Sequence, residues 1–372
     1  MQPSLFYWHL LNTIDGLGSR SMLNIVRHFP DPQQATEASS AMLLQLGLTG
    51  SVVNKIKTCA KPSRSHAQLD KASRSWDAML EQNIIPIVFG GENYPARLAM
   101  IDDAPAMLYA KGKLAVLDEP QIAIVGSRNA SHDALALAQA FAQDFATSGI
   151  TITSGMALGV DGRAHCGAID GGGDTCAVLG TGVDVVYPAR HRSLAQGIEE
   201  HGVLVSEYLP TTPPRPGHFP KRNRIIAGLS RGVLVVKASL KSGSLITARL
   251  AMEYNREVFA IPGSIHNPRA RGCHSLIRQG AVLVETVADV LTELKSTLGE
   301  YTTEEQPKEI ASPMRKLPTQ LANIIEAMGY NPISPDALSE RLAMPVYELS
   351  SYLLELELQD CVVAVTGGYQ RC

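Results

Sequence analysis

The chain has 372 residues, of which 45% are hydrophobic and 19% are charged, and its formal net charge is -3, so it can form two or three domains. We expect a cytoplasmic protein with no membrane partner, because no apolar run is long enough to span a bilayer and the first residues lack a secretion signal. The six cysteines are scattered without a CxxC pair, which argues against a disulfide framework or a structural zinc site, and we expect no cofactor.

Residues 1–78 have the pattern of a small helical domain. Amphipathic stretches at 5–14, 16–29 and 35–48 are separated by short polar turns, and Gly16 and Gly18 form the first of these turns. The glycine turn resembles that of a helix-hairpin-helix or SAM-like module. Because such turns are common, a packing domain without a ligand of its own is an equally good interpretation.

Residues 79–298 alternate between short β-branched runs and amphipathic helical stretches. Two clear helical stretches are 133–149 and 244–255. Strands are predicted at 84–89, 122–126, 150–155, 175–180, 203–207, 232–237 and 257–263. Fully hydrophobic strands separated by helices indicate an α/β fold, an extended Rossmann-like, doubly wound and mostly parallel sheet, whose ligands bind beyond the carboxyl ends of the strands.

The last part of the chain is predicted to be a winged-helix domain. Residues 299–316 are polar, acidic and interrupted by proline, which is typical of a linker. In residues 317–372, three helices at 317–329, 334–344 and 345–359 precede a hairpin that turns at Gly367 and Gly368. The third helix carries Glu348, Glu355 and Glu357 in place of cations, which favours contact with protein over insertion into a DNA groove.

Two strand-to-helix loops have the composition of phosphate-binding sites. Gly126, Ser127 and Arg128 follow one predicted strand and lead into a helix, where free backbone N–H groups and the guanidinium can bind an anion. Ser242, Gly243 and Ser244 precede another helix in the same way. The dinucleotide fingerprint GxGxxG and the phosphate-binding loop GxxxxGK[ST] are both absent, so NAD and ATP are poorly supported.

A third loop, 154–165, contains Gly155 and then Asp161 and His165, four residues apart on one helical face. This pair is interpreted either as an acid/base couple or as a local hydrogen bond that caps and orients the helix. We favour the second interpretation, because no nucleophile or metal ligand is nearby in the sequence.

The segment from Tyr208 to Met252 contains no Asp or Glu at all, although the chain is acidic overall. A short cationic cluster is usually a solvated face, but the length of this acid-free segment favours an anionic ligand. Its cations are Arg215, Lys221, Arg222, Arg224, Arg231, Lys237, Lys241 and Arg249.

Seven ordered motifs in these regions resemble the DNA-processing protein A (DprA, also called Smf) family. They lie at 125–128, 154–165, 178–188, 206–208, 219–230, 242–248 and, as a pair, at 260–263 and 272–281. The resemblance implies a protein, not an enzyme, that binds single-stranded DNA, protects incoming strands and loads a RecA-type recombinase during natural transformation.

The resemblance also assigns residues. The phosphate-gripping arginine of the family falls on Arg128 and its FPxRNR element on residues 219–224, and Phe219 is interpreted either as a stacking face for a base or as a buried core residue. Lys237 stands where many members have a glutamate, which weakens any catalytic role there, and Arg190 compensates for Ala189. The DNA-binding set is Gly126, Ser127, Arg128, Gly155, Arg190, Arg215, Phe219, Lys221, Arg222, Asn223, Arg224, Ser242, Gly243 and Ser244.

Two further expectations complete the sequence-based hypothesis. The resemblance and the apolar pattern near 273–279 predict a homodimer with Met252, His274, Ile277 and Arg278 at or near its interface, a surface that overlaps the recombinase contact. The alternative function is a nucleoside-monophosphate phosphoribohydrolase-like enzyme of the lysine-decarboxylase-like group, whose PGGxGTxxE signature this sequence lacks. A purely architectural role for the two end domains stays open.

Overall fold

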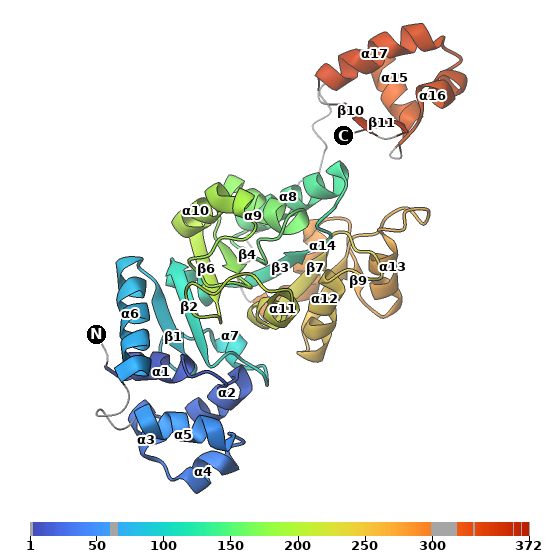
Figure 1. Cartoon of the computed structure of the whole chain (residues 1–372). Coiled ribbons are helices and arrows are strands. Elements are labelled where there is room, and N and C mark those ends of the chain that lie inside the picture. Colours follow the sequence, from blue (N-terminus) through green and yellow to red (C-terminus); the bar gives the residue numbers. More distant parts are fainter. Residues whose placement is uncertain are drawn as a thin grey trace. The chain divides into compact units, whose positions relative to one another are not determined.

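A computed structural model describes residues 3–59, 66–298, 318–329, 332–359, 361–365 and 367–371 (Figure 1). They form two compact units, within residues 1–304 and 305–372. The predicted linker at 299–316 lies outside the described residues. Among the described residues, no helix is both long and apolar enough to cross a membrane.

The first unit begins with a group of helices. These are α1 (Pro3–Asn12), α2 (Ser19–His28), α3 (Pro32–Glu37), α4 (Ser40–Gln45), α5 (Gly50–Cys59) and α6 (His66–Glu81). Asp31 and Ser39 cap α3 and α4 by accepting hydrogen bonds from backbone N–H groups, and Gly16 has a φ of +94°, the left-handed conformation that this turn requires. Helix α6 continues through residue 78, the predicted boundary of this helical domain.

The sheet of the first unit has, among the described residues, nine strands in the order β1-β2-β6-β5-β4-β3-β7-β8-β9. Their bounds are β1 Ile85–Val88, β2 Met107–Gly112, β3 Gln121–Val125, β4 Thr151–Ser154, β5 Thr175–Val178, β6 Gly202–Ser206, β7 Gly232–Val235, β8 Glu257–Ala260 and β9 Val282–Leu283. All seven predicted strands are present, and β2 and β9 are additional. From β6 to β9 the sheet is parallel, which confirms the predicted α/β fold, whereas β1 and β2 run antiparallel at one edge.

Helices cover both faces of this sheet (Figure 1). On one face, α8 (His132–Thr147), α9 (Val160–Asp170), α10 (Arg192–His201) and α14 (Val287–Leu298) pack over residues such as Ile124, Ile152 and Leu204. On the other, α7 (Ala96–Ala99), α11 (His218–Leu229), α12 (Ser244–Glu253) and α13 (Arg271–Arg278) pack over Val125 and Val235. Short 3₁₀ turns lie at η1 (Leu114–Leu117) and η2 (Ala189–His191). Burial on both faces explains why the central strands are apolar throughout.

The second unit confirms the predicted winged helix. It contains α15 (Thr319–Met328), α16 (Pro335–Leu342), α17 (Val346–Leu358) and the antiparallel pair β10 (Val362–Val365) and β11 (Gly368–Arg371). Gly367 and Gly368 both have a positive φ, which explains why glycine occupies the turn. Helix α17 buries Leu349, Leu353 and Leu356 in the core of this unit.

Candidate nucleic-acid interface

The order of the strands reverses between β3 and β7, and the loops after these two strands form the centre of the candidate site. At such a reversal the loops diverge to opposite faces of the sheet and leave a crevice at its carboxyl edge. The Ser127 N–H donates to the Lys237 carbonyl at 2.8 Å, which joins the two loops. The site predicted from loops 126–128 and 242–244 therefore lies at the usual ligand position of this fold.

The loop that carries Arg128 is held by five hydrogen bonds that leave its guanidinium free. One of them, from the Val160 N–H to the Ser127 carbonyl at 3.3 Å, connects the loop to the start of α9. Besides this bond and that between Ser127 and Lys237, the Asn129 N–H donates to Ser127 Oγ at 3.2 Å, and Lys237 Nζ donates to Ser131 Oγ at 2.8 Å. Arg269 Nη1 donates to the Asn129 carbonyl at 3.1 Å. Arg128 itself is exposed and has no ion pair among the described residues, so its charge is available to an anion.

Phe219 provides an aromatic surface directly beneath Arg128. The Arg128 guanidinium carbon lies 5.6 Å from the centre of the Phe219 ring, and the half-exposed ring of Tyr187 lies 5.5 Å from it. A Cβ atom at Gly180 would lie 2.9 Å from the Phe219 ring, so this glycine makes room for it. Phe219 is half-buried, which fits both a packing role and a base-stacking role.

Arg222 lies below the floor of the site and does not reach its surface. Its side chain is buried beneath Gly155, where a Cβ atom would come within 2.0 Å of Nη1, and Nη1 donates to the Val178 carbonyl at 2.5 Å. Burial lowers the pKa of Arg222 to about 10 and raises the pKa of Asp161, an effect on Asp161 that Arg222 opposes. Arg222 therefore supports the 154–162 loop as a buried cation.

Arg224 is neutralised within the protein, and Lys221 is partly so. Arg224 Nη2 lies 2.7 Å from Glu207 Oε2, both side chains are almost completely buried, and Arg224 Nε lies 3.3 Å from Asp103. Lys221 Nζ lies 3.6 Å from Glu207, and the lysine side chain is 47% exposed. Glu207 stands immediately before the acid-free segment in the sequence, so the segment does not lack a balancing acid in three dimensions.

The predicted phosphate-binding loop 242–244 joins the same site. Ser242 Oγ and Ser244 Oγ are 2.7 Å apart at the start of α12, and Asn223 Nδ2 donates to the Gly243 carbonyl at 3.4 Å. This contact links loop 242–244 to the FPKRNR element. Gly243 is exposed and Ser244 is buried, so the exposed backbone and the Ser242 hydroxyl are the groups that a ligand can reach.

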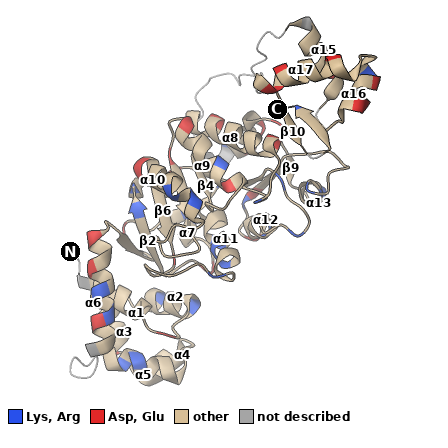
Figure 2. Ribbon diagram, turned by 45° about the horizontal axis from the view of Figure 1, so that its top comes forward, with Lys and Arg blue, Asp and Glu red and all other residues tan. Residues whose placement is uncertain are grey.

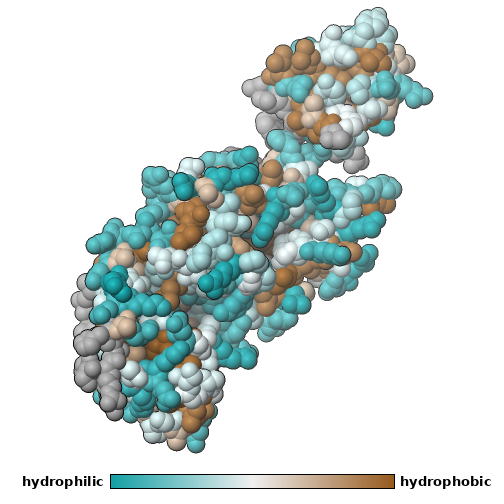
Figure 3. Space-filling model, in the orientation of Figure 1, coloured by the Kyte–Doolittle hydropathy of each residue, from teal (hydrophilic) through white to brown (hydrophobic). Residues whose placement is uncertain are grey.

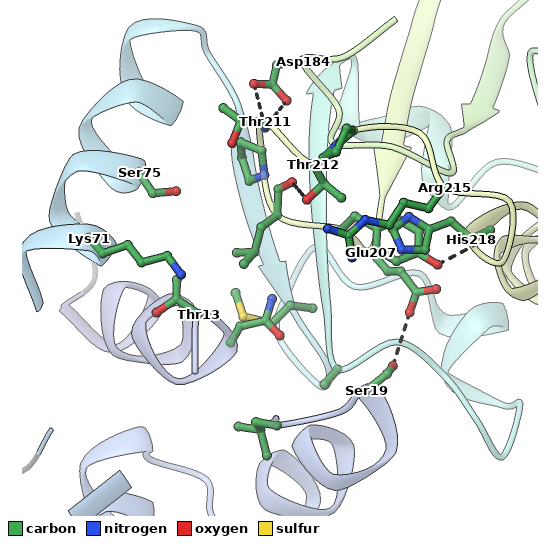
Figure 4. Close-up of a pocket in the computed structure, with 18 of the residues that line it drawn as sticks. Thr13, Ser19, Lys71, Ser75, Asp184, Glu207, Thr211, Thr212, Arg215 and His218 are labelled. Atoms are coloured by element: carbon green, nitrogen blue, oxygen red, sulfur yellow. Dashed lines mark hydrogen bonds between the residues drawn. The ribbon is translucent and has the colours of Figure 1, made fainter. Parts of the chain in front are cut away.

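The two outlying arginines lie on different sides of the site. Arg190 is exposed on η2, and the neighbouring His191 packs over the 154–162 loop through a hydrogen bond between its Nδ1 and the Met156 carbonyl at 3.0 Å. Arg215 is exposed on the loop between β6 and α11, where it lines a separate cavity beside α6 (Figure 4). Figure 2 shows basic residues on α10, α11 and α12.

Asp161 and His165 have separate partners and no hydrogen bond to each other. Asp161 accepts from the Ala157 N–H at 3.4 Å, and His165 Nδ1 lies 2.7 Å from the Thr175 hydroxyl. Burial lowers the pKa of His165 to about 3, so the imidazole is neutral at physiological pH. The hydrogen bond expected within this pair is therefore absent: Asp161 contacts the residues just before α9, and His165 bonds to β5.

The predicted interface residues cluster on α12 and α13. Met252 and Arg278 are exposed, and Ile277 is half-buried against the core. His274 shares a 2.8 Å hydrogen bond with the Gly263 carbonyl through Nε2. Met252 also lines a groove of about 400 Å³ beside Leu240, Ile246 and Leu276.

Comparison with known proteins identifies the family. The model described as DNA recombination-mediator protein A matches residues 86–295, which is more than half of the chain and includes every predicted DNA-binding residue. This chain belongs to that family. A second model, the DprA winged helix domain, matches residues 307–368.

Individual DprA and Smf proteins agree with this assignment. Protein Smf of Escherichia coli K12 is 39% identical over 98% of this chain and 95% of its own length. DNA processing protein DprA of Streptococcus pneumoniae is 47% identical over 54% of this chain and 71% of its own. Both matches therefore place this chain among the DNA-processing proteins of the DprA family.

Two solved DprA structures share the fold. The X-ray structure of DprA from S. pneumoniae superposes with a TM-score of 0.64 and 36% identity, covering 79% of this chain and 99% of that one. A structure of DprA from Helicobacter pylori superposes with a TM-score of 0.52 and 30% identity, covering 57% of this chain and 95% of that one. That structure concerns the single-stranded DNA binding mode of the H. pylori protein.

Proposed function

We propose that this DprA-family chain binds single-stranded DNA at the carboxyl edge of β3, β4, β5 and β7. The observation that carries this proposal is the exposed guanidinium of Arg128, without an ion pair among the described residues and directly above the ring of Phe219. A cation binds the backbone of any strand, and an aromatic ring stacks on any base. Because a base must be unpaired to reach such a ring, the arrangement favours single strands over duplex DNA.

In this proposal the other predicted residues have graded roles. Arg190, Lys221 and the 242–244 loop contact phosphates beside Arg128, and Arg222 positions the floor through Gly155. Arg224 holds the site together through Glu207. Arg215 lies on the neighbouring cavity.

We also propose that the protein protects incoming strands and loads a RecA-type recombinase during natural transformation, acting in the cytoplasm. Membership of a family described as recombination mediators supports this role. A homodimer formed through Met252, His274, Ile277 and Arg278 would place two DNA sites on one long strand and increase the affinity through effective concentration. Ile277→Arg, examined by light scattering, should give a monomer.

The decisive experiment measures the affinity of the full chain for labelled single-stranded and duplex oligonucleotides over a salt series. Single strands should bind more tightly, with an affinity that falls as salt rises, because phosphate contacts release condensed counterions. Arg128→Ala should weaken binding equally for different base sequences. Equal affinity for duplex and single strands would contradict the proposal.

The proposed function contains no catalytic step. Asp161 is buried, His165 is held neutral by burial, and the described residues contain no group of three His, Cys, Asp or Glu side chains that could hold a metal ion. The purified protein should therefore release no ribose phosphate from nucleoside monophosphates. Turnover that disappears in Asp161→Ala would support the phosphoribohydrolase alternative.

A further inference from the structure

A cavity of about 730 Å³ separates α6 from the loop that joins β6 to α11 (Figure 4). Helix α6 contributes Lys71, Arg74 and Ser75 to its wall, and the loop contributes residues from Glu207 to Arg215. The turn between α1 and α2 closes a third side. The volume is in the range of small-molecule sites. No sequence motif indicates the cavity, because its walls come from segments far apart in the chain.

Both carboxylates in this cavity are already engaged. Asp184 accepts from the Thr211 N–H through both of its oxygens, at 2.8 and 3.0 Å. Glu207 is bound by Arg224 at 2.7 Å and by the Ser19 hydroxyl at 3.3 Å. The contact with Arg224 neutralises Glu207 within the fold, whereas the bonds from the Thr211 N–H hold Asp184 in place without cancelling its charge.

The cations of the cavity are, by contrast, available. Lys71 and Arg215 extend toward the cavity from opposite walls in Figure 4. Arg74 and Arg215 have no ion pair in the described part of the chain, and Lys71 makes only an exposed contact of 3.8 Å with Asp15. The net effect is a positive cavity that suits an anionic ligand.

The remaining lining suits a nucleotide better than a bare anion. Ser75 provides a hydroxyl group for hydrogen bonding, whereas the hydroxyl groups of Thr13 and Ser19 are already bonded to Leu10 and Glu207. The apolar surface comes from Leu17, Met107, Leu209, Pro210 and Pro213. Sites for small molecules combine such apolar walls with a few polar groups, and a base together with its phosphate has the matching two-part chemistry.

The first turn of α11 connects this cavity to the Arg128 site. Phe219 faces Arg128 and Gly180, whereas its neighbours His218 and Lys221 line the cavity. The His218 ring stacks on Tyr208 with a 4.0 Å separation of ring centres and a 12° angle, and Lys221 Nζ lies 5.9 Å from the Tyr208 ring. A strand that passes over Phe219 can therefore continue along α11 into the cavity.

We propose that this cavity holds a nucleotide of the strand that leaves the Arg128 site, so that α6 of the N-terminal helical segment forms part of the DNA-binding surface. This inference rests on the proposed function and extends it to a second subsite. The same chemistry would accept a free nucleotide, and the experiment separates the two sources.

The test compares single strands of about 4 to about 16 nucleotides, the range covered by single-strand-binding modules. The full-length double variant Lys71→Ala/Arg74→Ala should bind the shortest strands as the unmodified protein does. For the longest strands, the affinity of this variant should be lower than that of the unmodified protein by a factor on the order of ten. The slope of log affinity against log salt for these strands should become shallower by about 0.7 for each lost phosphate contact.

Two variants separate occupancy of the cavity from its charge. Ser75→Trp fills the space while keeping every cation, and it should produce the same selective loss for long strands, whereas Ser75→Ala should not. Lys295→Ala removes one exposed charge from α14, which lines neither site, and should bind all lengths normally. Circular dichroism and the thermal midpoint confirm that each variant is folded.

The outcomes distinguish this inference from the proposed function. If Arg128→Ala weakens binding at every length but the α6 variants behave like the unmodified protein, the cavity inference is overturned and the proposed function stands. If the α6 variants weaken binding selectively while Arg128→Ala has no effect, the Arg128 site is wrong and the cavity stands. Tight binding of free dTMP that Ser75→Trp abolishes without affecting long strands would also overturn the inference.

Discussion

Helices α11 and α17 lie in different units and expose opposite chemistry. The first turns of α11 expose Lys221 and half-bury Phe219 beside loops rich in glycine and serine. Helix α17 exposes Glu348 and Glu355 together with Tyr347, Leu354 and Leu358, which are 57–78% exposed. Figure 3 shows brown, hydrophobic patches on one face of the winged-helix unit. Similar helices thus present a surface suited to a polyanion in one unit and a surface suited to protein in the other.

The largest effect expected in this comparison concerns the buried ion pair beneath the cationic surface. Arg224→Met should lower the free energy of unfolding of the first unit by about 3–5 kcal/mol, because it leaves Glu207 buried without its main partner. In a urea titration of the full chain followed by fluorescence, the first unit should unfold at a lower urea concentration than in the unmodified protein. In Arg20→Met, which removes an exposed arginine of α2, both transitions should stay where they are. Equal stability of Arg224→Met and the unmodified protein would show that the buried carboxylate of Glu207 does not need this arginine as its partner.

The next largest effect is expected at Gly155. In Gly155→Ala the new methyl group would lie 2.0 Å from Arg222 Nη1, so the buried side chain must shift, at a cost of about 1–3 kcal/mol. DNA affinity should fall with stability, because the same loop forms the floor of the site. The matched control is Gly217→Ala, at a position with open space and an ordinary φ. A variant as stable as that control would mean that the contact between Gly155 and Arg222 is unimportant.

Acid should destabilise the first unit through two buried histidines. The described part of the second unit contains no histidine and should not share this effect. Burial lowers the pKa of His9 to about 4 and of His165 to about 3. Below pH 6.5 these histidines are therefore protonated in the unfolded chain but stay neutral in the folded chain. Stability from these two residues is complete above pH 6.5 and is lost as the pH falls toward 4, by about 1.4 kcal/mol per pH unit for each histidine. Between pH 7 and 4.5, the unfolding free energy of His165→Gln should change less steeply with pH than that of the unmodified protein. An equal pH dependence would show that His165 does not have a lowered pKa in the folded protein.

The smallest effect is expected on α17. Glu355→Lys makes this exposed helix more basic, yet it should change single-strand affinity less than twofold, within the roughly ±0.5 kcal/mol of ordinary surface substitutions. Lys221→Glu on α11, measured by the same fluorescence anisotropy titration, should weaken binding clearly. Comparable changes in single-strand affinity in the two variants would contradict the proposal that α11 contacts DNA and α17 does not.

Much of the fold was readable from the sequence because local patterns determine it. Apolar runs predicted all seven of the strands named, and the glycine pair at 367–368 predicted the hairpin of the winged helix. Strand β2 was missed because MLYAKG contains no β-branched residue and ends in lysine and glycine. The antiparallel edge was also missed, since an apolar run does not show in which direction its neighbour runs.

The site was predictable as a set of loops but not as a set of exposed charges. Arg128 and Phe219 were identified by their motifs, and the structure brings them together. The burial of Arg222 and Arg224 was not foreseeable, because it depends on Val178, Asp103 and Glu207, which the fold supplies from other elements. The motif SEY at 206–208 contained one signal, the acidic Glu207 immediately before the cationic segment.

The five hydrogen bonds that hold the Arg128 loop have a consequence for the kinetics of binding. A loop that is ordered before the ligand arrives loses little conformational entropy on binding, so a strand meets a rigid receptor. Substitutions at the site should therefore act mainly on the dissociation rate, while association stays governed by diffusion and charge. Ser131→Ala removes the hydroxyl that accepts from Lys237 and frees one end of the loop. In that variant a slow step, independent of DNA concentration, should enter the association kinetics.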